Sequence, residues 1–267
     1  MENGNYILET GTKDQERLFI VNDIVNPYSI PFLRQHIHPG AKVLEVGCGI
    51  GLMSQEIAKI VGEKGSVLGT DLNTDQVIIA CNLLPDHYKK RLRFEKASAY
   101  DLSLLQDKYD VVYIRFLLIH LDDVLKVLEQ IKTVLRPGGL LLIEDLAGNH
   151  TLASDPEDPR LVHVRKMDDL QEELQQSNFD IASTLGTLLR KTDFKLISDE
   201  TIQPSLDTPN KRRLFSLGMK SLESALVQNN KLTSQEAQAM IKEVEAMEKD
   251  QSVKLYCYKV GQIAATF

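Results

Sequence analysis

Short apolar runs alternate with segments of helical spacing through the first half of the chain. Residues 43–46 form an apolar, β-branched run that predicts a buried strand, and residues 52–60 carry apolar side chains at helical spacing. The alternation predicts further strands at 66–71, 91–96, 109–114 and 140–144, with helices after Asn73 and at 122–135. Strands that alternate with helices in this way predict a parallel sheet covered on both faces.

The chain is more helical on either side of this alternation. Two helical patterns precede the first strand: one covers 14–24, and the other begins after Pro27 and ends near Pro39 and Gly40. After the fifth strand, the pattern predicts a helix at 158–178, a second helix that follows it to about 191, and two more at 211–228 and 233–249. It also predicts strands at 194–202 and 252–265. The short basic run at 211–213 is expected to be a solvated start of a helix.

No linker rich in glycine, proline or serine divides these segments. We therefore predict one domain over residues 1–267. Within it, residues 1–40 form an N-terminal helical cap and residues 41–150 a cofactor-binding core. Residues 151–267 supply lid helices, which cover the carboxyl edge of the sheet, and the last two strands.

Composition narrows the class of protein. A hydrophobic content of 43% suits a folded core, and a formal net charge of -7 argues against nonspecific binding to nucleic acid or an anionic membrane. Cys48, Cys81 and Cys257 form no CxxC pair, so we expect neither a metal site nor a disulfide framework. We predict a cytoplasmic protein from three features of the sequence. Its thiols are expected to be reduced, its N-terminus shows no signal-peptide pattern, and it has no long apolar run.

Three alternating glycines follow the first predicted strand at once. Gly47, Gly49 and Gly51 stand between this strand and a helix, which is how an open α/β sheet binds a small organic cofactor. The dinucleotide fingerprint requires a small residue where this chain has Leu52, which argues against NAD. S-adenosylmethionine has no pyrophosphate, and its methionine end lies against bare backbone with its carboxylate near helix amides.

Asp71 stands at the end of the second predicted strand, 20 residues after Gly51. A carboxylate in this place can accept hydrogen bonds from both hydroxyls of a ribose. The alternative is that Asp71 only caps the following helix. The glycine loop that precedes it favours the cofactor role.

At this point the chain resembles the class I S-adenosylmethionine-dependent methyltransferases of small-molecule type. The resemblance rests on Val43-Leu44-Glu45-Val46-Gly47-Cys48-Gly49-Ile50-Gly51, Thr70-Asp71-Leu72, Tyr109-Asp110-Val111-Val112-Tyr113 and Leu135-Arg136-Pro137-Gly138-Gly139. It covers about 40–150 closely. The resemblance implies a doubly wound, Rossmann-like α/β fold with seven mostly parallel strands, the last antiparallel, and helical lid insertions.

The resemblance also implies roles for individual residues. Gly47, Cys48, Gly49 and Gly51 would line the methionine part of S-adenosyl-L-methionine. Glu45 would position that loop and the amino end of the cofactor. The remaining implied cofactor contacts are Asp71 on the ribose, Leu72, Ser98 and Ala99 around the adenine, Arg115 near the sulfonium, and Tyr6 as part of the N-terminal cap.

The acceptor is expected over the carboxyl ends of the fourth and fifth strands. The candidates there are His120, Glu144 and Asp145. His120 suits a general base near neutrality, or else is a packed histidine bonded to a loop carbonyl. Asp145 suits an orienting group for a substrate amine or hydroxyl, or else a turn cap before Gly148. We predict no metal ligands among the other histidines.

The sequence thus predicts an enzyme that transfers a methyl group from S-adenosyl-L-methionine to an O, N or C nucleophile of a small-molecule acceptor. The same residues are compatible with two alternative functions. One is a non-catalytic module that binds the cofactor, and the other is a methyltransferase acting on protein or tRNA. The acidic net charge and the lack of a recognisable RNA-binding appendage favour the small-molecule acceptor.

Overall fold

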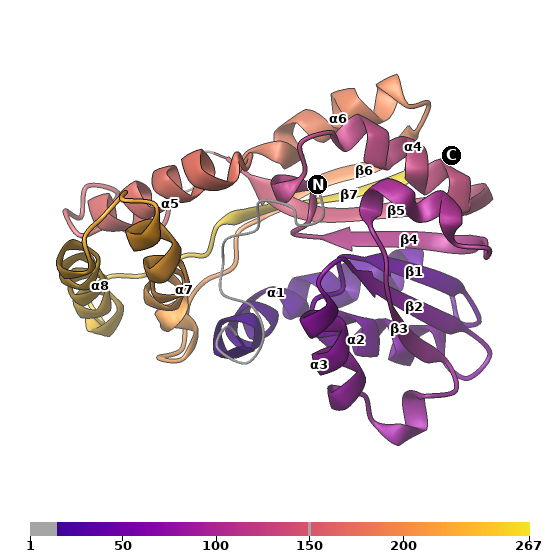
Figure 1. Cartoon of the computed structure of the whole chain (residues 1–267), viewed down its shortest axis with the longest axis horizontal. Helices are drawn as coiled ribbons and strands as arrows, with labels where there is room; N and C mark the ends of the chain where they lie inside the picture. The colour runs from indigo at the N-terminus through magenta and orange to yellow at the C-terminus, as the bar shows by residue number, and fades with distance from the viewer. Residues whose placement is uncertain (1–14, 149–150) are drawn as a thin grey trace.

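The computed structural model describes residues 15–148 and 151–267, and a seven-stranded sheet forms its centre (Figure 1). The strands are β1 (Lys42–Val46), β2 (Ser66–Asp71), β3 (Leu92–Lys96), β4 (Tyr109–Arg115), β5 (Leu135–Ala147), β6 (Lys195–Ile202) and β7 (Lys259–Thr266). Their order in the sheet is β3-β2-β1-β4-β5-β7-β6. The neighbours among β1–β5 pair in parallel, and β7 is antiparallel to β5 and β6. The predicted fold, including its antiparallel last strand, is confirmed.

Helices cover both faces of the sheet. They are α1 (Gln15–His36), α2 (Leu52–Val61), α3 (Thr74–Leu83), α4 (Val124–Val134), α5 (Leu161–Gln175), α6 (Ile181–Lys191), α7 (Leu214–Gln228) and α8 (Ser234–Lys249). Figure 1 shows α4 and α6 on one face and α2 and α3 on the other. Ile131 and Leu185 are fully buried in the first of these layers and Ile57 in the second. Each such side chain contributes roughly 1.5–3 kcal/mol by leaving water.

A third apolar core lies beside the sheet. α5, α7 and α8 gather at one end of the molecule, away from β1–β3 (Figure 1). Their buried side chains, among them Met167, Leu226 and Val244, form a cluster that also takes in Ile20 and Ile24 of α1. The second half of α1 packs elsewhere, with Leu33 in the core of α2 and the sheet. The helix α1 therefore joins the helical core to the sheet.

α1 corrects the prediction of two separate helical patterns before the first strand. It is one helix of 22 residues that contains Pro27 and Pro31. Proline removes one helical hydrogen bond and ordinarily kinks or ends a helix. Here tertiary bonds fix the same segment, because Ser29 donates to Glu144 and Asn26 accepts from Arg115.

Two further predictions about the second half were wrong. Arg212 was expected in a solvated helix start, but it is 5% exposed and donates to four backbone carbonyls, those of Met247, Glu248, Asp250 and Val253. The last strand begins at Lys259 rather than at residue 252, because Leu255 and Tyr256 make only isolated bridges to other loops. Among the described residues, no helix combines the length and apolar character needed to cross a bilayer.

Candidate functional site

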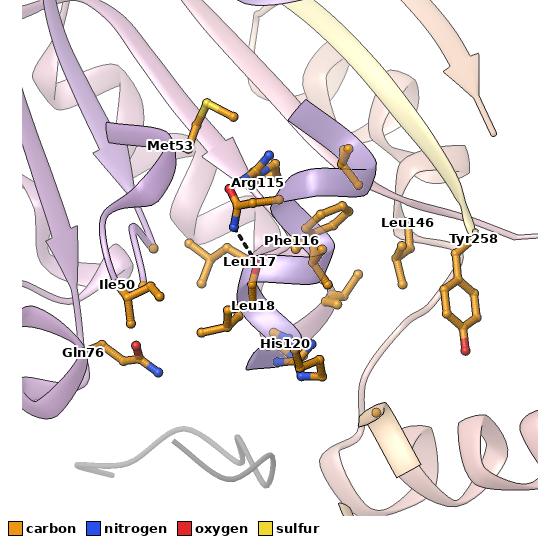
Figure 2. A pocket seen from close by; sticks show the side chains of 18 of the residues that line it. Leu18, Ile50, Met53, Gln76, Arg115, Phe116, Leu117, His120, Leu146 and Tyr258 are labelled. Carbon is orange, nitrogen blue, oxygen red and sulfur yellow. Dashed lines mark hydrogen bonds between the residues drawn. The ribbon is translucent and has the colours of Figure 1, made fainter. Parts of the chain in front are cut away.

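A cavity of about 760 Å³ opens where β1, β2 and β4 end. This is the edge of an open α/β sheet at which ligands bind. The first half of α1, together with α5 and α7, closes the other side, with Leu18, Met167 and Leu214 in the wall. Figure 2 shows Ile50 and Gln76 at one end of the cavity, Tyr258 at the other, and the segment that follows β4 between them.

Gly47 and Gly49 line one end of this cavity. Their φ angles are +76° and +53°, which only glycine adopts without strain. A Cβ atom on Gly47 would lie 3.0 Å from the Leu117 side chain, whereas one on Gly49 would meet nothing within 4 Å. Cys48, between them, also lines the cavity, and burial raises the pKa of its thiol well above the usual range. The thiol is therefore a packing group here.

Gly51 has a different role from the one implied by the resemblance. It does not line the cavity; a Cβ atom there would lie 2.4 Å from the ring of Phe94 on β3 and 3.0 Å from Ala80 on α3. Its φ is also positive, at +76°. The third glycine thus allows the loop to pack closely on the sheet, while the first two face the cavity.

Asp71 faces the cavity from the end of β2. Its Oδ2 accepts a hydrogen bond from the amide of Gly49 and its Oδ1 from that of Asn73, each over 2.9 Å. Burial raises the pKa of Asp71, and these backbone donors oppose that shift. The helix cap is Asn73, which accepts from the amides of Asp75 and Gln76, so the alternative that Asp71 caps α3 is wrong. Leu72 beside it lines the cavity and is 41% exposed.

Glu45 and Arg115 lie at the ends of β1 and β4, beneath the glycine loop. Glu45 is 3% exposed and accepts a hydrogen bond from the hydroxyl of Ser54. Burial raises the pKa of Glu45 to about 7, against the opposing effects of Ser54 and Arg115. The Arg115 side chain lines the cavity but donates to Asn22 and Asn26 over 2.8 Å. It therefore holds α1 over the site, a role that the resemblance did not imply.

The structure does not bring every implied cofactor residue to the cavity. Ser98 and Ala99 lie outside its lining, at the start of a short 3-10 helix. The Ser98 hydroxyl accepts from the amide of Tyr100 over 3.1 Å and so caps that helix. Tyr6 lies outside the described residues.

His120 does reach the cavity (Figure 2). It belongs to a 3-10 turn, Leu118–His120, between β4 and α4. Burial, and to a lesser extent the charge of Arg17, lowers the pKa of His120 to about 4. The imidazole is therefore neutral at neutral pH and only weakly basic.

Asp145 is not placed to meet a substrate. It is fully buried on β5, outside the cavity lining, and accepts hydrogen bonds from the amides of Leu118 and Leu146 over 2.8 and 2.9 Å. Its carboxyl thus fixes the turn after β4, and the prediction that Asp145 orients a substrate group is wrong. Glu144 is also fully buried and accepts from Ser29 and Gln262.

The sequence reasoning missed the pair formed by Asp168 and Tyr258. Both line the cavity, and the Tyr258 hydroxyl donates to Oδ1 of Asp168 over 2.8 Å. Burial, with smaller contributions from Glu172 and Asp169, raises the pKa of Asp168 to about 7 against the opposing effect of the hydrogen bond from Tyr258. A signal was present, because a helix places residues 164, 167, 168 and 171 on one face, and that face carries Asp168.

Comparisons with known proteins agree with this geometry. The family described as "Methyltransferase domain" matches residues 25–199. The O-methyltransferase cnsE of Penicillium expansum is 30% identical over 201 residues, which cover 70% of this chain and 67% of that protein. The ubiquinone/menaquinone biosynthesis C-methyltransferase UbiE of Hahella chejuensis is 33% identical over 108 residues, 40% of this chain and 43% of that protein. The chain thus spans less than half of the length of such C-methyltransferases.

Solved structures share the fold. The YcgJ protein of Bacillus subtilis covers 90% of this chain and 98% of its own length, with a TM-score of 0.59 and 16% identity. At this identity the likeness concerns the fold alone. Two comparisons agree: the family model matches residues 25–199, and the O-methyltransferase cnsE aligns over two thirds of its length. The glycine loop and Asp71 fit the same family. The chain belongs to the class I S-adenosylmethionine-dependent methyltransferases.

Proposed function

We propose that this chain transfers a methyl group from S-adenosyl-L-methionine to an O, N or C nucleophile of a small-molecule acceptor. The observation that carries the proposal is the division of one cavity into two ends. One end has the glycine loop and Asp71, and the other has an apolar wall from α5 and α7. Such a cavity has room for a methyl donor and an acceptor in contact with each other.

The residues at the first end fit S-adenosyl-L-methionine. At Gly49 the backbone is bare and faces open space, which leaves room for a methionine chain against it. Asp71 presents a carboxylate at the end of β2 that would hold ribose hydroxyls, and Leu72 offers exposed apolar surface for a purine. Asp71 gives this end a carboxylate, which suits a cationic ligand.

The residues of the chain then have distinct roles. S-adenosyl-L-methionine supplies an electrophilic methyl group on a sulfonium. Gly47, Gly49 and Asp71 bind and orient it, and Arg115 holds α1 across the opening through Asn22 and Asn26. The apolar side chains of α1, α5 and α7 exclude water, which keeps the reacting groups aligned in a low-dielectric site.

His120 stays a candidate for contact with the acceptor. It lines the cavity beside the segment that divides the two ends. With its pKa lowered to about 4, its neutral ring can accept a hydrogen bond from an acceptor group throughout the neutral pH range. As a proton acceptor it would be weak, so we assign it positioning of the acceptor.

Three further expectations remain proposals with their own support. The names of the relatives, an O-methyltransferase and C-methyltransferases of quinone biosynthesis, support small-molecule acceptors. The net charge of -7 supports an acceptor other than nucleic acid. Cys48, Cys81 and Cys257 are free thiols, which supports a reducing, cytosolic compartment.

Calorimetry with S-adenosylhomocysteine tests the first half of the proposed function. We expect saturable binding at one site, and no comparable binding of NADH. Release of S-adenosylhomocysteine from S-adenosyl-L-methionine, measured against a panel of hydroxylated, amino and carbon-acid small molecules, tests the second half. Absence of S-adenosylhomocysteine binding would contradict the proposed function, and binding without turnover on any acceptor would favour a non-catalytic module.

A further inference from the structure

A polar pair lies in the largely apolar end of the cavity. The Tyr258 hydroxyl donates to Oδ1 of Asp168 over 2.8 Å, and both side chains line the cavity. We propose that Asp168, positioned by Tyr258, binds a hydroxyl group on an otherwise apolar acceptor molecule. This inference rests on the proposed function, because it names the class of acceptor for the same cavity.

The pair is held firmly by its surroundings. The Tyr258 ring packs edge-on against Phe215 of α7, with 5.8 Å between ring centroids and 84° between ring planes. The preceding residue, Cys257, is buried and donates its amide to the carbonyl of Pro204 over 2.8 Å. In Figure 2, Tyr258 lies near Leu146, at the opposite end of the view from Ile50 and Gln76. The pair therefore belongs to the end of the cavity away from the glycine loop.

One oxygen of Asp168 is available to a ligand. Tyr258 occupies Oδ1, whereas Oδ2 accepts no hydrogen bond from the residues that the structure describes. A partly buried carboxylate oxygen without a donor is costly, so a ligand that supplies a donor there gains binding free energy. Val164 and Met167 on α5, with Met219 on α7, surround the pair with apolar surface. The complementary ligand is an apolar body with a hydrogen-bond donor.

The charges around Asp168 select a neutral donor. Burial, Glu172 and Asp169 raise the pKa of Asp168 to about 7, and the hydrogen bond from Tyr258 lowers it. The other charged or titratable groups around the two cavities that share Asp168 include Arg17, His120, Arg165 and Asp180. An anionic ligand would be repelled by the carboxylates of Asp168, Asp169, Glu172 and Asp180. A cationic amine would lose its hydration among methionine, valine and phenylalanine side chains. A hydroxyl avoids both costs.

Binding of 2-naphthol, naphthalene and 2-naphthylmethylamine tests the inference. The chain contains no tryptophan, so naphthyl fluorescence can be excited beyond the absorption of the protein. We expect 2-naphthol to bind more tightly than naphthalene in the presence of S-adenosylhomocysteine. In Asp168→Asn the dissociation constant of 2-naphthol should rise roughly tenfold to a hundredfold, as expected for loss of a charge-assisted hydrogen bond. The dissociation constant of naphthalene should stay the same.

Glu173→Gln is the matched control, because Glu173 is an exposed carboxylate on α5 that lines neither cavity. Its naphthol binding should stay close to that of the wild type. The inference would be overturned if naphthol and naphthalene bound equally well or if neither bound. It would also be overturned if the test and control substitutions changed naphthol binding equally. Tighter binding of the amine than of naphthol would show a cation site instead. S-adenosylhomocysteine is titrated separately in every variant, so loss of its binding identifies a failure of the proposed function.

Tyr258→Phe tests positioning through Asp168. Because the Tyr258 hydroxyl lowers the pKa of Asp168, its removal should raise that pKa. The ionised carboxylate is the better acceptor, so naphthol binding should strengthen as pH rises through about 7 in the wild type, and at higher pH in Tyr258→Phe. A change in affinity without a shift of this midpoint would overturn the positioning role.

Discussion

Buried carboxylates at the ends of the strands look alike in the sequence but face different surroundings. Asp71 points into the cavity and keeps the capacity to bind a ligand. Asp145, near the end of β5, is fully buried outside the cavity, with its oxygens bonded to the amides of Leu118 and Leu146. Asp71 also accepts two amide hydrogen bonds, so access to the cavity decides whether each carboxylate can serve a ligand.

Asp71→Asn tests the residue assigned to the ribose. The substitution keeps an oxygen that can accept the amide bond of Gly49 or Asn73, so the fold should persist. Loss of the charge should weaken S-adenosylhomocysteine binding by roughly 1.5–3 kcal/mol in calorimetry. Asp86→Asn, at an exposed position after α3, is the control and should bind like the wild type. An unchanged affinity in Asp71→Asn would remove Asp71 from the site.

Glu45 should make stability depend on pH. Burial raises its pKa in the native state to about 7 from an ordinary value of 4.5, so the native state holds a proton that the unfolded chain has lost. The associated stability is fully present below pH 4.5 and is lost as pH rises through about 7. Glu45→Gln should remove up to roughly 3 kcal/mol of this pH dependence in urea unfolding at several pH values. Parallel curves for the wild type and the variant would contradict the raised pKa.

The residue-level site was predictable only in part. A glycine loop that is followed by an acidic strand end predicts Gly47, Gly49 and Asp71 because the pattern and the function share one local segment. Asp168 and Tyr258 are 90 residues apart in sequence, and only tertiary packing brings them together. Gly51 was predicted as a contact because spacing does not show which glycine faces a cavity and which faces Phe94.

At the scale of elements, α1 shows how tertiary contacts override local signals. The sequence places most strands within one or two residues, because short apolar runs between turns are strong signals. Pro27 divided α1 in the prediction, yet the helix continues through it. The polar side chains of Asn22 and Asn26, which accept from Arg115, supply the contacts that local propensity cannot show.

Arg115→Met tests whether the hydrogen bonds from Arg115 to Asn22 and Asn26 hold α1 on the sheet. The substitution removes the donors to Asn22 and Asn26 while it keeps much of the side-chain length. We expect a loss of roughly 2–4 kcal/mol in unfolding free energy, because the partly buried amide oxygens of Asn22 and Asn26 lose their donors. Amide exchange should become faster in α1 and in the helices α7 and α8 that pack on it. Arg136→Met is the control: its exposed guanidinium pairs with Asp110, so the loss should stay below about 1 kcal/mol. Equal losses in the two variants would contradict the role of Arg115.

At the scale of the whole molecule, we propose that the sheet and the helical core are one domain. Ile20 and Ile24 pack in the cluster of α5, α7 and α8, whereas Phe32 and Leu33, roughly two to four turns further along α1, pack in the cluster that includes β1 and α2. A single helix with one half packed in each core transmits unfolding of either core to the other. The cavity, whose walls come from both cores, depends on this coupling.

Amide hydrogen exchange in increasing denaturant tests this coupling. In the wild type, peptides from β1 and β4 and peptides from α7 and α8 should converge on one unfolding free energy, because two-state domains open as a unit. In Arg115→Met, which loosens α1, the α7 and α8 peptides should exchange at a lower free energy than the strands do. Saturating S-adenosylhomocysteine, at about 100 times its dissociation constant, should add roughly 2.7 kcal/mol to all peptides of the wild type. Separate free energies for strands and helices in the wild type would mean that the chain holds two independent units, with the cavity at their interface.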